Sequence, residues 1–203
     1  RRVCYTFAAM KKTLFPLILI LLLLGGFGCS TQTTSDDRQA EINRDEILFE
    51  AKKTGLIMND EEIRLMKQIV QVESVEGTNP QQVNTYLSTP IEGWKSAALA
   101  DVTGGGSFGL AFTQFTDQQF TLIAKMGNLP ELQEGFVYEG WLVKRGDELR
   151  IVSTGKAQYV EDQLVNIFVA STDLSPYDFY VLTVEPDDDN PAPDEHILEG
   201  MIR

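Results

Sequence analysis

Apolar residues recur at helical spacing in three short segments before residue 91. Between residues 38 and 53 this spacing predicts a first helix, which Gly55 is placed to end. A second helix is predicted to begin at the capping residue Asn59, and a third ends before Pro90. We therefore expect a small helical subdomain over residues 38–90.

From residue 91 onward, apolar residues alternate with small or polar ones. Phe108, Leu110 and Phe112 alternate in this way, as does the run from Phe120 to Met126. Further short runs lie between Gly and Pro turn residues, at 136–144, 149–153, 163–170, 177–185 and 196–202. Short strands without helices between them predict an antiparallel β-sandwich over residues 91–203, immunoglobulin-like in its general architecture.

An apolar stretch near the N-terminus follows a different pattern. It runs from Leu14 to Gly28 after Lys11 and Lys12, and small residues stand just before Cys29. Its length suits a secretory signal rather than the roughly 20 residues of a membrane span. Residues 10–28 resemble a bacterial lipoprotein signal, which implies that Cys29 becomes the lipid-bearing first residue of the mature chain.

The residues around this signal support an anchored arrangement. Met10 begins a complete signal by itself, so we interpret residues 1–9 as an artefact of the assigned start site. Residues 29–37 are polar and rich in Ser and Thr, which is typical of a flexible tether. Gly26 stands at a position where lipoprotein signals usually have a leucine. The alternatives are an uncleaved short anchor and an ordinary signal peptide. We expect the chain to be held at the cell membrane through Cys29, on the extracytoplasmic side.

The charge of the chain argues against nucleic-acid binding. The segment before Cys29 holds four of the 17 basic residues and none of the 30 acidic ones, which leaves 13 basic against 30 acidic residues and a formal charge of −17. A chain this acidic is repelled by phosphate groups, so a helix-turn-helix interpretation of the three helices is disfavoured. Anionic lipid headgroups repel it too, and acyl chains are therefore expected to provide the anchoring.

Two glycine-containing segments match nucleotide-binding fingerprints only in part. Gly104, Gly106 and Gly109 fit G-x-G-x-x-G, but the residues that follow alternate as a strand instead of opening a helix. Residues 153–156 resemble the end of a P-loop, yet Arg150 stands where the first glycine belongs. We interpret both segments as turns and expect no cofactor.

Few other residues suggest chemistry. His196 is the only histidine, and no nucleophile elbow or zinc-binding helix motif accompanies it. Asp187, Asp188 and Asp189 form the densest acidic cluster and are weak metal candidates, because carboxylates could supply oxygens to calcium. The cluster lacks the residue spacing of an EF-hand, so we interpret it as a solvated acidic turn and not as a metal site. We expect no catalytic residues.

Aromatic residues gather at strand positions of the C-terminal half. They could line a ligand surface, but aromatics at alternating strand positions are more often part of a core. The core interpretation is preferred for Trp94, Trp141, Tyr177, Phe179 and Tyr180.

Short motifs in this half follow an order that occurs in one known family. They lie at residues 129–132, 138–142, 153–156, 183–186 and 191–193. An LP segment, a Tyr-x-x-Trp strand, a glycine turn and a Thr-x-Glu-Pro segment before a Pro-containing loop resemble the extracytoplasmic C-terminal domain of anti-sigma-K factors. The resemblance covers about residues 107–200. It implies a β-sandwich that serves as a sensory or interaction module without known catalysis.

The sequence departs from that family in two places. Residues 187–190 replace the usual glycine-rich stretch after Glu-Pro, and only nine residues precede the signal, so direct capture of a sigma factor is not expected. The favoured function is a lipid-anchored extracytoplasmic binding or sensory module with a protein partner in the envelope. The alternatives are an envelope-side regulator of a sigma-factor or sensor pathway, acting through a transmembrane partner, and a cell-envelope hydrolase that uses paired carboxylates.

Overall fold

Short helices come early in the chain, and strands make up most of the rest. The computed structural model describes residues 43–68, 75, 77–78, 83–146, 148–188 and 192–203. The helices are α1 (Arg44–Lys53), α2 (Asp60–Gln68) and α3 (Val83–Leu87). The strands are β1 (Gly77–Thr78), β2 (Lys95–Asp101), β3 (Phe108–Thr116), β4 (Gln119–Gly127), β5 (Phe136–Lys144), β6 (Arg150–Lys156), β7 (Gln158–Val160), β8 (Gln163–Ala170), β9 (Phe179–Pro186) and β10 (Glu195–Met201).

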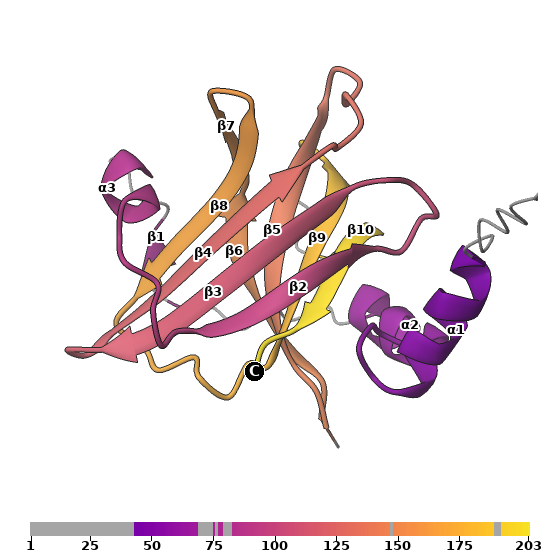
Figure 1. The fold of residues 1–203 in the computed structure, drawn as a ribbon, viewed down its shortest axis with the longest axis horizontal. Coiled ribbons are helices and arrows are strands. Elements are labelled where there is room, and N and C mark those ends of the chain that lie inside the picture. The colour runs from indigo at the N-terminus through magenta and orange to yellow at the C-terminus, as the bar shows by residue number, and fades with distance from the viewer. Residues whose placement is uncertain (1–42, 69–74, 76, 79–82, 147, 189–191) are drawn as a thin grey trace, which may run out of the picture. The chain divides into compact units, whose positions relative to one another are not determined.

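The described strands form one antiparallel sheet of ten strands (Figure 1). Their order is β1-β8-β4-β3-β2-β10-β9-β5-β6, and β7 pairs with β8 beside this path. The mainly β, antiparallel fold with a few N-terminal helices, predicted from the sequence, is confirmed.

Two halves of the sheet face each other across the main core. One half contains β8, β4, β3 and β2, and the other contains β10, β9, β5 and β6; the pairing of β2 with β10 joins them. Side chains from both halves form the largest apolar cluster, which includes Phe120, Leu122, Tyr138, Tyr180 and Leu182. The halves correspond to the two layers of the predicted sandwich, within one continuous sheet.

The sheet curls until β6 lies beside β8, and a buried asparagine links the two strands. The Nδ2 atom of Asn166 donates to the carbonyl oxygens of Thr154 at 3.2 Å and Gly155 at 2.9 Å. Its Oδ1 atom accepts from the hydroxyls of Thr154 at 2.6 Å and Tyr180 at 3.1 Å. Gly140 leaves the room for this cluster, because a Cβ there would lie 2.5 Å from both hydroxyl oxygens. All four hydrogen-bonding positions of the amide are thus filled.

The described helices cover two separate parts of the outer sheet surface. Met66 of α2 packs in a cluster with Trp141 of β5. Val83 of α3 packs instead on Ile123 and Ile167, which belong to β4 and β8. The helical segment therefore covers the sheet at two places.

The predicted cap of the second helix is confirmed. Asn59 Oδ1 accepts from the backbone N–H groups of Glu61 and Glu62, each at 3.0 Å. In return, Glu62 Oε2 accepts from the backbone N–H of Asn59 at 2.9 Å. This reciprocal capping box satisfies N–H groups that the first helical turn leaves without partners.

One predicted turn is wrong. Residues 153–156 belong to β6, where Ser153 pairs with Trp141 and Gly155 pairs with Gly140. The register shifts between these two pairs, and Gly155 has a φ of +80°. The glycine therefore permits an irregularity inside a strand, a role that the sequence alone does not distinguish from a turn.

Candidate ligand-binding pocket

A pocket lies where the pairing between β5 and β6 ends. Lys156, the last residue of β6, pairs with Glu139, and the next backbone N–H, that of Ala157, still donates to Tyr138 O at 2.8 Å. The chain then turns away, because β7 pairs with β8. A cavity of about 580 Å³ lies between the start of β5 and β7.

Three aromatic side chains line this cavity. Phe136 and Tyr138 come from β5, and Tyr159 comes from β7. Phe136 is 43% exposed and Tyr159 is 59% exposed, whereas Tyr138 is buried. The Tyr138 hydroxyl donates to the Pro130 carbonyl at 2.8 Å, which fixes the segment that carries Leu132. An apolar cavity of this size with few polar groups is typical of a small-molecule or peptide side-chain site.

Acidic groups surround the aromatic ones. Glu131, Glu161 and Asp162 line the cavity and are exposed, and the residues that line it, as far as the structure describes them, contain no Lys or Arg. Burial, with a smaller contribution from Tyr159, raises the pKa of Tyr138 to about 12, so its hydroxyl remains protonated at neutral pH. Carboxylates beside aromatic faces favour a positively charged ligand group over a negative one.

The acidic turn proposed as a weak metal candidate does not line the cavity, although it begins beside it, where the Asp187 N–H donates to the Gly135 carbonyl at 2.8 Å. Asp187 and Asp188 are exposed, and Asp187 forms an ion pair with Lys156. Asp189 lies outside the described residues. Within the described part of the chain, no group of three or more His, Cys, Asp or Glu side chains is placed to hold a metal ion.

His196 is buried on β10, away from the pocket. Its Nδ1 atom lies 2.7 Å from Glu199 Oε1. The other oxygen of Glu199 accepts from the backbone N–H of Met58 at 2.6 Å. The pair therefore holds the connection between α1 and α2 against the sheet.

Glu139 and Glu185, on the neighbouring strands β5 and β9, form one pair of interacting carboxylates. Burial raises the pKa of both Glu139 and Glu185 above the usual range. Ser153 donates to Glu139, and the backbone N–H of Asp194 donates to Glu185 at 2.8 Å. One oxygen of each carboxylate thus accepts a hydrogen bond from the protein, and neither glutamate lines the pocket.

Four of the five aromatic residues that the sequence assigned to a core are confirmed as core. Trp141, Phe179 and Tyr180 are buried, and Tyr177 is 7% exposed. Trp94 is half-buried and packs against the cluster beneath α3. The glycine fingerprint is also not a phosphate loop, because Gly109 lies in β3 and no helix follows the loop.

Cys29 and the signal-like segment lie outside the described residues. None of the helices that the structure describes is long and apolar enough to cross a membrane. No protein-family model matches the chain, and comparisons with curated proteins and with solved structures found no significant similarity. The anti-sigma-K-like interpretation stays a prediction from short motifs.

The sequence did not single out several pocket residues. Tyr138 and Glu131 belong to the motifs noted above, but Phe136, Tyr159 and Glu161 were not recognised. The available signal was Tyr159 after the polar Gln158, followed by Val160 and then the acidic pair Glu161 and Asp162. That pattern is typical of an exposed hairpin tip and does not reveal the facing strand.

Proposed function

We propose that this protein is a lipid-anchored, extracytoplasmic binding module without catalytic activity. Cys29 carries the anchor, and the pocket between β5 and β7 is the ligand site. The ligand is a positively charged group attached to an apolar body, such as an amine or a basic side chain of a protein partner in the envelope.

The pocket is the observation that carries this proposal. Strands β5 and β7 form two of its walls. The hydrogen bond from the Tyr138 hydroxyl to the Pro130 carbonyl fixes the segment with Glu131 and Leu132, which forms another wall. The exposed ring of Tyr159 leaves an aromatic face for a cation, and Glu161 and Asp162 supply opposite charge. A fixed apolar site with a few polar groups requires little reordering on binding.

Titration with matched small molecules tests the ligand class. We expect phenethylammonium to shift the backbone amide NMR signals of residues around the pocket, and the neutral phenethyl alcohol to do so more weakly. Tyr159→Ala should weaken the ammonium binding about two- to fivefold, because an exposed cation–π contact contributes roughly 0.5–1 kcal/mol.

Two neighbouring variants serve as controls. Gln158→Ala alters the same strand and Glu134→Gln removes an exposed carboxylate, but neither residue lines the cavity. Both should leave the titration unchanged. Equal binding of the ammonium and the alcohol, or an affinity unaffected by Tyr159→Ala, would refute the proposed site.

A further inference from the structure

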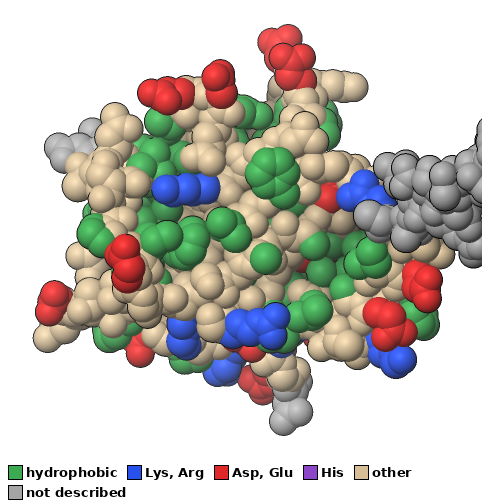
Figure 2. Space-filling model, viewed as in Figure 1, with side chains coloured by type: hydrophobic (Ala, Val, Ile, Leu, Met, Phe, Trp, Pro, Cys, Tyr) green, Lys and Arg blue, Asp and Glu red, His purple; other side chains and the backbone are tan. Residues whose placement is uncertain are grey.

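The outer side of β2 and β3 is an apolar surface that no described helix covers. We define the β2–β3 face as the outward side chains Ala98, Ala100, Phe108, Leu110 and Phe112. Phe108 is 63% exposed and Leu110 is 50% exposed. Figure 1 shows the helices on either side of these strands, and Figure 2 shows apolar side chains in the middle of the same view.

The large residues of β3 point away from the core. The buried positions of this strand are Gly109, Ala111 and Thr113. A Cβ at Gly109 would lie 3.0 Å from Leu99 Cδ1, so the inner side has no room for a larger residue. Phe108 and Leu110 therefore contribute little to the main core. Adjacent exposed apolar side chains of this size are typical of an interaction surface.

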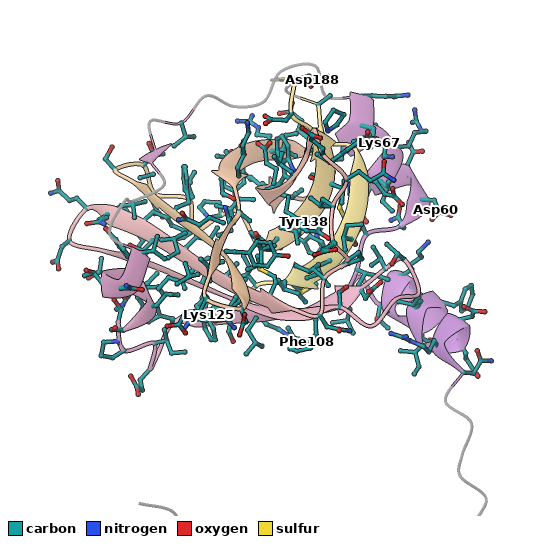
Figure 3. The ribbon with its side chains drawn as sticks, turned by 90° about the horizontal axis from the view of Figure 1, so that it is seen from above. Asp60, Lys67, Phe108, Lys125, Tyr138 and Asp188 are labelled. Carbon is teal, nitrogen blue, oxygen red and sulfur yellow. The ribbon has the colours of Figure 1, made fainter. Side chains whose placement is uncertain are left out.

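The β2–β3 face differs in charge from the rest of the chain. Of the 30 acidic residues, only Asp101 and Asp117 lie between residues 95 and 128. Asp101 is buried and accepts hydrogen bonds from the β2–β3 loop. Lys125 pairs in register with Leu110, and its Nζ donates to the Leu87 carbonyl at the end of α3 at 3.5 Å. Figure 3 shows Lys125 and Phe108 on the same side of the sheet. The strands that form the face thus carry little negative charge of their own.

The described residues begin at Asn43, close to this face. The Arg44 guanidinium donates to the Gly104 carbonyl at 3.3 Å, in the loop that leads into Phe108. Cys29 precedes Arg44 by 15 positions. Such a segment spans at most about 50 Å and, as a flexible chain, about 20 Å on average. An anchored bilayer surface is therefore within reach of the β2–β3 face.

We propose that the β2–β3 face docks on the lipid bilayer to which the chain is anchored. This inference rests on the proposed anchor at Cys29. Phe108 and Leu110 enter the headgroup region, and Lys125 lies at the edge of the docked face. Docking in this orientation holds the ligand pocket at a fixed direction relative to the membrane.

Fluorescence of the acylated chain in vesicles of phosphatidylcholine and phosphatidylglycerol tests this orientation. After acylation of Cys29 the mature chain has no free thiol, so one introduced cysteine can be labelled with NBD. Ala100→Cys places the label on the face, because Ala100 pairs with Phe108. The substitution removes no large side chain. Gln158→Cys, on the exposed strand β7, is the matched control.

We expect spin-labelled lipids to quench the label at residue 100 and not the label at residue 158. Adding Leu110→Asp to the Ala100→Cys chain should abolish the quenching while acylation, vesicle binding and the melting temperature persist. An acylated, vesicle-bound chain whose residue 100 is not quenched would overturn docking and leave the anchor intact. Protection from an aqueous quencher without lipid quenching would assign the face to a protein instead. A chain without acyl mass would overturn the anchor and this inference together.

Discussion

Asn166 shows how one residue determines the closure of the sheet. Within the described sheet β6 and β8 do not pair as neighbouring strands, and hydrogen bonds from the Asn166 amide link them instead. Burial raises the pKa of the Tyr180 phenol, so its hydroxyl stays protonated and donates to Asn166. A fully satisfied buried polar group of this kind favours one register over others.

Replacing this asparagine should therefore be costly. Asn166→Leu leaves two carbonyls and two hydroxyls without their partner, and we expect a loss of about 3–5 kcal/mol in the free energy of unfolding. Tyr180→Phe removes one bond and should cost about 1 kcal/mol. Urea denaturation of both variants measures the difference. Equal losses would mean that the amide contributes no more than a single bond.

At the scale of elements, the β2–β3 loop depends on one carboxylate. Asp101 Oδ1 accepts from the Thr103 N–H at 2.9 Å and the Gly105 N–H at 3.1 Å, and Oδ2 accepts from the Ser107 N–H at 2.9 Å. Burial acts to raise the pKa of Asp101, but hydrogen bonds from Thr103 and Ser107 outweigh it and hold the pKa below its usual value. The ionised form is thus favoured in the folded chain.

This direction of the pKa shift fixes the sign of a pH dependence. A lowered pKa stabilises the fold above the unfolded value of about 3.9, and that stabilisation is lost as the pH falls through the folded value. Asp101→Asn should cost about 2 kcal/mol at neutral pH, and less in acid. Thermal melting across this pH range measures it, with the exposed Asp117→Asn as the control. If the stability difference between the wild type and Asp101→Asn did not shrink in acid, the role of the Asp101 charge would be contradicted.

The sequence predicts elements well where a local pattern determines them. The bounds of β5 and β8 were predicted as observed, because β5 follows Gly135 and both strands contain long apolar runs. β2 was missed, since alanines give a weak strand signal, although Ala97, Leu99 and Asp101 alternate as buried residues. The pocket could not be predicted because it depends on where β6 stops pairing with β5 and β7 begins to pair with β8, which is set by pairing between distant segments.

At the scale of the whole molecule, attachment and orientation are separate properties. An acyl chain contributes roughly 0.8 kcal/mol for each buried methylene, so lipid on Cys29 would dominate attachment. The β2–β3 face is small, with Lys125 of β4 beside it, and it suits a weak contact that acts once the chain is tethered. Tethering raises the effective concentration of such a contact without adding affinity to it.

This division predicts different outcomes for two substitutions in the full-length chain. Cys29→Ser should remove the acyl mass and release the chain from the membrane fraction, because the β2–β3 face alone is too weak to hold it. Leu110→Asp should leave the chain acylated and in the membrane fraction. Membrane fractionation with intact-mass analysis measures both, and Cys4→Ser is the matched control because Cys4 precedes the signal. Retention of Cys29→Ser in the membrane fraction would show that attachment does not depend on the lipid, and release of Leu110→Asp would show that the face carries attachment itself.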